Sequence, residues 1–197
     1  MPWSMETWKQ SGAHANQVSE PSNAVFSLLW RIKVVPKVLT TVWRILLDRI
    51  STYQNLVVRG LVVNSPLCVF CNLHVESTQH LFLDCAFAYC VWMMCYQWIG
   101  VVGTQNRDIC NHFMNFHLTN MSEKQNQVWR GVWVAITRSI WEHRNHVIFR
   151  QGVPDPEETL QAAQLIVWLW LKHKESSFSY SFSDWILNPL QCLLSVC

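Results

Sequence analysis

Charged residues are scarce in this 197-residue chain, and the acidic ones are not grouped as a catalytic site would require. Only 14% of the residues are charged, and the 13 acids include no Asp-Asp pair and one adjacent pair, Glu157-Glu158. A polymerase holds two metal ions on paired aspartates, and a ribonuclease H site needs clustered carboxylates. No motif typical of a reactive nucleophile surrounds any cysteine or histidine either. We therefore expect no catalytic residues and no enzymatic activity.

The chain also lacks an apolar segment that could cross a membrane. Residues 85–106 carry no charge, but Gly100 and Gly103 interrupt them. The fully apolar part is shorter than the ~20 residues that a bilayer needs. The N-terminal residues 1–20 are polar and contain no apolar signal core. We expect an intracellular protein of the nucleus or cytoplasm, neither secreted nor bound to a membrane.

Apolar and aromatic residues are abundant. Half of the residues are hydrophobic, and 12 are tryptophan. A chain of this composition is expected to cover part of its surface with a partner or a neighbouring domain. The formal net charge of +2 by itself indicates no particular partner.

Three cysteines and one histidine have the spacing of a zinc site, Cys68-x2-Cys71-x8-His80-x4-Cys85. The C-x2-C pair lets two sulfurs from one tight turn bind the same ion, and the H-x4-C pair presents two ligands about one helical turn apart. Ligation by thiolates favours zinc over calcium or magnesium. Because four protein ligands leave no position for water, we predict one structural Zn2+.

Other uses of these cysteines are possible. His74 or Cys90 could replace a ligand, although His74 is very close to Cys71 and Cys90 falls in a predicted helix. The eight cysteines could also form disulfides, or be small buried hydrophobes. The missing signal sequence argues against a secreted disulfide framework.

The apolar periodicity predicts a mainly α fold, in which a small helical zinc-binding module is followed by long C-terminal helices. We expect a helix over 37–50 with an ion pair between Arg44 and Asp48, and a second helix that begins with a Ser51-Gln54 capping box. Further helices are predicted over residues 85–99, 123–149 and 155–174. The resulting division is a loose tail (1–23), the zinc-binding domain (24–99), a loop-rich linker (100–122) and a helical C-terminal region (123–197).

The residues around the predicted zinc site resemble the zinc-binding domain found after the reverse transcriptase of plant non-LTR (LINE-type) retrotransposons. The resemblance covers about residues 24–99 and is carried by Leu29-Trp30, Val35-Pro36-Lys37-Val38, Trp43-Arg44-Ile45-Leu46-Leu47-Asp48-Arg49-Ile50, Thr52, Asn55-Leu56, Arg59-Gly60, Cys68-x2-Cys71, Glu76-Ser77, His80-Leu81-Phe82, Cys85 and Trp92. Ser51 stands where proline is common, and Thr41 where an aromatic or aliphatic residue is usual. These departures leave the ligands untouched.

The C-terminal half resembles the region that follows this domain in the same elements. The matching words are Trp141-Glu142-x-Arg144-Asn145-x3-Phe149, Trp168-x-Trp170-Leu171-Lys172 and Phe182-Ser183-x-Trp185-x2-Asn188-Pro189-x2-Cys192. The resemblance implies a non-catalytic part of a retrotransposon polyprotein. It also implies two partners, which are RNA or DNA and the reverse transcriptase domain of the parent element.

Binding of RNA or DNA is the first functional hypothesis. Zinc with three thiolates carries a net charge of −1, so the affinity for phosphate must come from nearby cations. Residues 31–59 supply six of them against the single acid Asp48, namely Arg31, Lys33, Lys37, Arg44, Arg49 and Arg59. Trp30 and His74 could stack on bases, although packing is the expected role of each.

The alternative is a protein-interaction or scaffolding module that docks on the polymerase and has no affinity for nucleic acid. The high apolar content favours this alternative. A second basic group lies along the helix predicted over about 123–149 and at the residue that follows it, where we expect a solvated helix face. It consists of Arg130, Arg138, Arg144 and Arg150, with His143 and His146.

Overall fold

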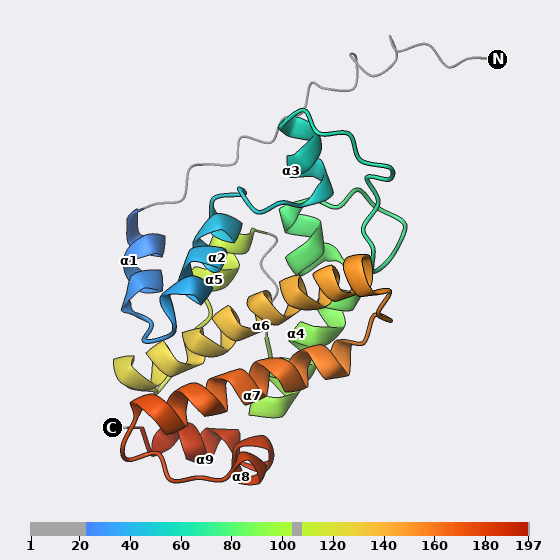
Figure 1. Ribbon diagram of the computed structural model, residues 1–197. Helices are drawn as coiled ribbons and strands as arrows, with labels where there is room; N and C mark the ends of the chain where they lie inside the picture. Colours follow the sequence, from blue (N-terminus) through green and yellow to red (C-terminus); the bar gives the residue numbers. More distant parts are fainter. Residues whose placement is uncertain (1–22, 104–107, 197) are drawn as a thin grey trace, which may run out of the picture.

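The computed structural model describes residues 23–103 and 108–196, and it is mainly α as predicted (Figure 1). In these residues there is no strand, only an isolated antiparallel bridge between Leu67 and Val75. The predicted tail over 1–23 lies outside the described residues, apart from Asn23. The helices are α1 (Asn23–Arg31), α2 (Pro36–Leu46), α3 (Tyr53–Val58), the π-helix η2 (His80–Asp84), α4 (Ala86–Ile99), α5 (Ile109–Met114), α6 (Glu123–Arg150), α7 (Pro156–Lys174), α8 (Phe182–Leu187) and α9 (Pro189–Leu194).

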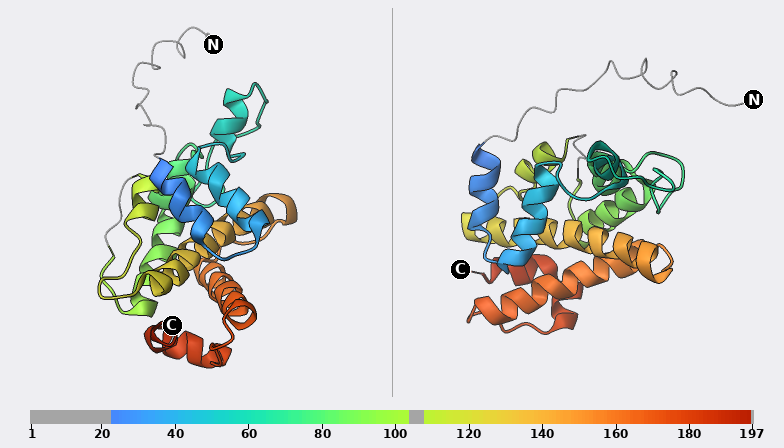
Figure 2. Two further views of the ribbon diagram at one scale, coloured as in Figure 1. Left: turned by 90° about the vertical axis from the view of Figure 1, so that its left-hand side faces the viewer. Right: turned by 45° about the horizontal axis from the view of Figure 1, so that its top comes forward.

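The long helices α6 and α7 form a hairpin on which the other elements are assembled (Figures 1 and 2). Helix α2 packs on α6, α4 packs on α7, and α8 and α9 follow α7 at the C-terminal end. One continuous apolar core joins the N-terminal and C-terminal elements, and it includes Trp92, Trp133 and Trp185 with no exposed surface. The boundaries of the four predicted regions remain a prediction.

The start of α2 and the loop that follows it differ from the prediction. The helix begins at Pro36, where a missing N–H costs nothing, and it ends at Leu46 rather than at residue 50. Asp48 then adopts a left-handed conformation with φ 52° and accepts hydrogen bonds from Asn55 and Thr78. Because Asp48 lies outside the helix, the predicted ion pair with Arg44 does not form.

The caps of the other helices follow from local sequence. Thr52, not Ser51, caps α3, because its hydroxyl accepts from the N–H of Asn55 at 3.3 Å. The predicted capping box does not form, and the single capping bond lies one residue later than predicted. Helix α6 begins with a complete capping box formed by Ser122 and Gln125, and Asp155 caps α7 as predicted.

Three short helices were not predicted individually. Helix α5 falls within the predicted linker, and α8 and α9 lie in the predicted helical C-terminal region, beyond the last helix expected there at 155–174. Each has only six residues. Fewer than two helical turns carry too little periodicity to be recognised, and such short helices are stabilised by tertiary packing. Burial of Phe113 in α5 and of Trp185 in α8 supplies that packing here.

A buried histidine links α5 to the centre of the core. The Nδ1 atom of His112 accepts a hydrogen bond from the indole N–H of Trp133 at 2.8 Å, and its Nε2 lies 3.0 Å from the hydroxyl of Tyr96. Burial lowers the pKa of His112 to about 4, so the ring is neutral near pH 7.

No helix in the described part of the chain is both long and apolar enough to cross a membrane. Helix α4, which contains most of the uncharged segment, has 14 residues and is largely buried in the core.

Candidate metal centre

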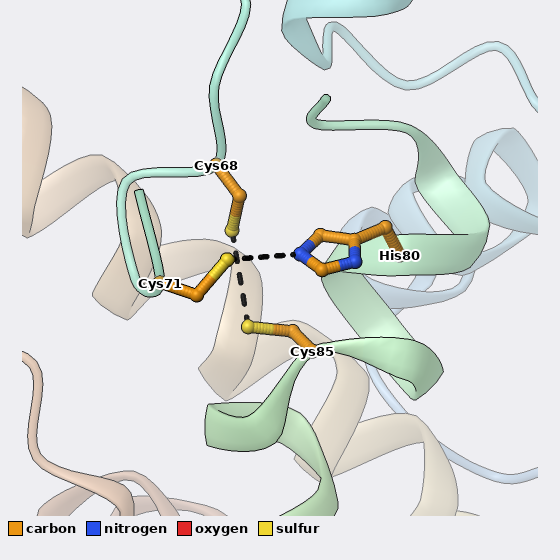
Figure 3. Close-up of side chains that lie close together, drawn as sticks. All are labelled: Cys68, Cys71, His80 and Cys85. Carbon is orange, nitrogen blue, oxygen red and sulfur yellow. Dashed lines mark hydrogen bonds between the residues drawn. The ribbon is translucent and has the colours of Figure 1, made fainter. Parts of the chain in front are cut away.

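The first two ligands lie on a short hairpin-like turn between the bridge residues Leu67 and Val75. The N–H of Cys68 donates to the carbonyl of His74 at 2.8 Å, and the N–H of Asn72 donates to the carbonyl of Cys68 at the same distance. Asn72 has φ 54°, a left-handed conformation that asparagine tolerates better than most residues. The turn brings the sulfurs of Cys68 and Cys71 to the same side (Figure 3).

The other two ligands lie at the two ends of the π-helix η2, since His80 is its first residue and Cys85 follows its last. The N–H of Cys85 donates to the carbonyl of His80 at 2.8 Å, a bond that spans five residues. The hydroxyl of Ser77 accepts from the N–H of His80, and Cys85 is the N-cap of α4. The sequence predicted an ordinary helical turn between the two ligands. The wider π turn brings both side chains to the metal position instead.

The four side chains meet in a cluster that fits one zinc ion (Figure 3). Their ligand atoms all lie within 4.8 Å of one another. The sulfurs of Cys68 and Cys85 are 3.9 Å apart, and the sulfur of Cys71 is 3.3 Å from Nε2 of His80. Tetrahedral zinc with Zn–S bonds of ~2.3 Å requires about 3.8 Å between two sulfurs. The distances match a closed Cys3His site, so the zinc is structural.

The alternative ligands are not part of this cluster. His74 and Cys90 are both exposed, and the ring of His74 lies 5.2 Å from that of His80. Within residues 23–103 and 108–196, no other group of three or more histidine, cysteine or acidic side chains has the geometry of a metal site.

Two of the four ligands, Cys68 and His80, hold protons more tightly than usual, whereas hydrogen bonds to the sulfurs of Cys71 and Cys85 lower the pKa of these thiols against the opposing effect of burial. The hydrogen bond to Cys85, together with burial, raises the pKa of Cys68 to about 12. The hydrogen bond to Cys68 raises the pKa of His80 to about 8. Zinc binds thiolate and neutral imidazole, so its binding must release these protons.

A buried ion pair connects the zinc-binding segment to α6. Arg144 donates from Nη2 to Oε1 of Glu76 at 2.6 Å and from Nε to Oε2 at 3.2 Å. The side chains of Arg144 and Glu76 are 4% and 0% exposed. The guanidinium also lies 4.9 Å from the ring centres of Tyr53 and Trp141. Arg144 is therefore enclosed and bidentate, the strongest geometry for this pair.

The backbone of Glu76 connects the ion pair to the turn that carries Cys68 and Cys71. Its N–H donates to the carbonyl of Pro66, and its carbonyl accepts from the N–H of Gln54. A stack of three rings forms a second contact between the turn and α6. Phe70 of the turn stacks on Phe87 with ring centres 3.9 Å apart, and Phe87 stacks on His143 of α6. Two consecutive residues of α6, His143 and Arg144, thus support the turn that carries two zinc ligands.

The comparisons with known proteins agree with this chemistry. Residues 4–92 match the family described as zinc-binding in reverse transcriptase. The match supports a reverse transcriptase zinc-binding domain in the N-terminal part of the chain, and it contains all four ligands. It ends within α4, so the long C-terminal helices lie outside it. Neither the search of curated proteins nor that of solved structures found a match.

All six basic residues predicted for nucleic-acid binding are exposed around this zinc-binding domain. Lys37 and Arg44 lie two helical turns apart on one face of α2. Arg59 reaches back to the carbonyl of Arg49 with its Nη2 at 2.6 Å, which brings these two residues together. Arg31 ends α1, and Lys33 lies in the turn between α1 and α2. Trp30 is also exposed (52%), as is His74, so packing is not the main role of either.

The basic residues of α6 do not form the solvated face that the sequence indicated. Arg130, His143 and Arg144 are buried, and only Arg150 and His146 are exposed. Helical periodicity cannot tell the buried basic positions from the exposed ones, because the residues that bury them come from other parts of the chain. Glu76, the most important partner, could be suspected only from its position between two ligand pairs.

Proposed function

We propose that the chain is a non-catalytic module of a plant-type non-LTR retrotransposon, and that it binds RNA or DNA beside a reverse transcriptase in the nucleus or cytoplasm. The observation that carries this proposal is the group of exposed cations next to the zinc-stabilised fold. None of the six forms an ion pair with another described residue. Cations without acidic partners remain available for phosphates.

The zinc ion supports nucleic-acid binding only by stabilising the fold, and it does not itself contact the phosphates. Its complex with three thiolates is negatively charged and would repel a phosphate. Arg44 lies in the last turn of α2, Arg49 in the loop between α2 and α3, and Arg59 directly after α3. The side chain of Asn55 donates to the carbonyls of Asp48 and Ile50 and so fixes the backbone of that loop. The metal and this connection together present the cations at fixed positions.

The test is a salt titration of binding to a labelled oligonucleotide. Removing one phosphate contact reduces the slope of log affinity against log salt by roughly 0.7 for single strands and 0.9 for duplexes. Arg44→Gln and Arg49→Gln should each show this reduction. Arg150→Gln removes an exposed arginine that ends α6 and is not one of the six predicted contacts, so it should leave the slope unchanged. A wild-type protein that does not bind at low salt would refute the proposal.

A second candidate function is docking on the polymerase, and one observation favours it. Aliphatic side chains are exposed along α3, the loop after it and the metal turn, and Val62 is 97% exposed. The group consists of Val57, Val58, Leu61, Val62, Leu67, Leu73 and Val75. Apolar surface of this kind is typical of protein-interaction sites.

Docking can be distinguished from nucleic-acid binding by its response to salt and to substitution. Val58→Ser with Val62→Ser should weaken binding to the reverse transcriptase domain of the parent element, with little dependence on salt. The same double variant should bind oligonucleotides like the wild type. Equal binding of the variant and the wild type to the polymerase would remove this candidate.

A further inference from the structure

A groove opens where three segments that are distant in the sequence meet. The turn between α1 and α2 lies beside the N-terminal half of α6 and the C-terminal half of α7 (Figure 1). The space between the lining atoms, open mouth included, is about 470 Å³. Aliphatic side chains cover most of its floor, and they are Ile32, Val34, Val128, Val167 and Leu171.

Polar and aromatic groups from each of the three segments surround this floor. Lys33 comes from the α1–α2 turn, Lys124 and Gln127 from α6, and Trp170 and Lys174 from α7. Glu175 is the only acid among the described residues of the lining, and it binds Lys124 at 2.9 Å. Lys33 and Lys174 are exposed and form no ion pair with any described residue. The mouth of the groove therefore carries a net positive charge.

We propose that this groove binds an unpaired nucleobase of a single-stranded RNA or DNA, with the adjoining phosphates on Lys33 and Lys174. The inference rests on the proposed function and extends it to a preference for single strands. The flat ring of Trp170 offers a stacking surface, and the amide of Gln127 can both donate to and accept from a base edge. The base of a duplex is paired and stacked, so it cannot enter.

These features favour a nucleotide over an acidic peptide. An aliphatic floor suits either ligand, but a base also uses an aromatic plane and an amide, and this groove is lined by both together with Lys33 and Lys174. The groove is lined by residues of the region matched to the zinc-binding family and by residues of the C-terminal helices α6 and α7. A ligand in it would therefore contact both parts of the chain.

Gly131 provides a direct way to close the groove. A Cβ atom added there would meet only Cγ2 of Ile32, at 3.8 Å, so a larger side chain has room to extend into the space. Gly131→Leu should fill the floor, whereas Gly131→Ala adds one methyl group and serves as the matched control. Trp170→Leu removes the aromatic ring on which a base would stack, whereas Trp170→Phe keeps an aromatic ring and serves as its control. Far-UV circular dichroism would verify that each variant is folded.

The measurement is fluorescence anisotropy with a labelled oligothymidylate, alone and annealed to its complement, at low salt. The wild type should bind the single strand more tightly. Gly131→Leu and Trp170→Leu should each weaken single-strand binding by roughly tenfold, as expected for the loss of one stacked base, and leave duplex binding unchanged. Gly131→Ala and Trp170→Phe should bind nearly as well as the wild type.

The possible results separate this inference from the proposed function. If the wild type binds both strands and neither groove variant changes its affinity, the groove inference is overturned while the proposed function survives. If the wild type binds no oligonucleotide, both are overturned. Binding of a labelled Glu/Leu copolymer that Gly131→Leu abolishes, without oligonucleotide binding, would assign the groove to a protein partner instead.

Discussion

Replacing Arg144 with methionine tests whether α6 holds the metal turn in place. The substitution preserves most of the side-chain volume but leaves the Glu76 carboxylate buried with no cation. Its remaining hydrogen bond would come from the N–H of Tyr53, at 3.1 Å. Removing one partner of a buried pair typically costs about 3–5 kcal/mol, because the other charge stays desolvated. We expect a loss of this size in the free energy of unfolding.

Arg138→Met is a matched control on the same helix. Arg138 pairs with Glu142 at i,i+4, and the two side chains are 22% and 50% exposed. A surface pair of this kind contributes about 0–1 kcal/mol. Urea unfolding of the zinc-loaded proteins, followed by circular dichroism, would compare the two variants.

The double variant Glu76→Gln/Arg144→Met identifies the cause of the loss. The glutamine keeps an acceptor for Tyr53 and removes the unpaired charge, so part of the stability should return. Zinc should also leave the Arg144→Met protein faster, since the N–H of Glu76 donates to the carbonyl of Pro66, two residues before Cys68. The reasoning would be refuted if Arg144→Met cost no more than Arg138→Met, or if the two substitutions in the double variant were simply additive.

Further predictions concern the metal and the buried histidine. The chain should bind one zinc per molecule, and Cys68→Ser or His80→Ala should abolish binding; native mass spectrometry that finds a folded, metal-free wild type would contradict this. Chelation should increase hydrogen exchange first in residues 60–99, and unchanged exchange there would show that the metal does not stabilise the turn. The pKa of His112 is lowered to about 4 in the folded protein, against about 6.5 when unfolded, so its stabilising contribution is complete above pH 6.5 and is lost as the pH falls toward 4. Between pH 6.5 and 5 this amounts to about 2 kcal/mol. His112→Gln should remove that part of the pH dependence of urea unfolding, whereas His117→Gln, at an exposed position, should not.

Local chemistry accounts for what could be predicted. The spacing of four ligands, the capping residue Asp155 and the apolar repeat of the long helices act over a few residues, and the structure contains the features they predict. Errors arose where a distant partner decides the outcome. Asp48 leaves the helix for hydrogen bonds with Asn55 and Thr78, and this prevents the pairing with Arg44 that its spacing favours.

The sequence by itself determined the mainly α class, the four zinc ligands and the exposed cations between residues 31 and 59, because each depends on spacing or composition. Only the tertiary structure decided how these parts are joined. It placed Arg144 against Glu76, 68 residues away, and it brought Lys33 and Lys174 into the lining of one groove. A buried charge or a shared groove exists only when two distant segments exclude water together, and no local pattern records that.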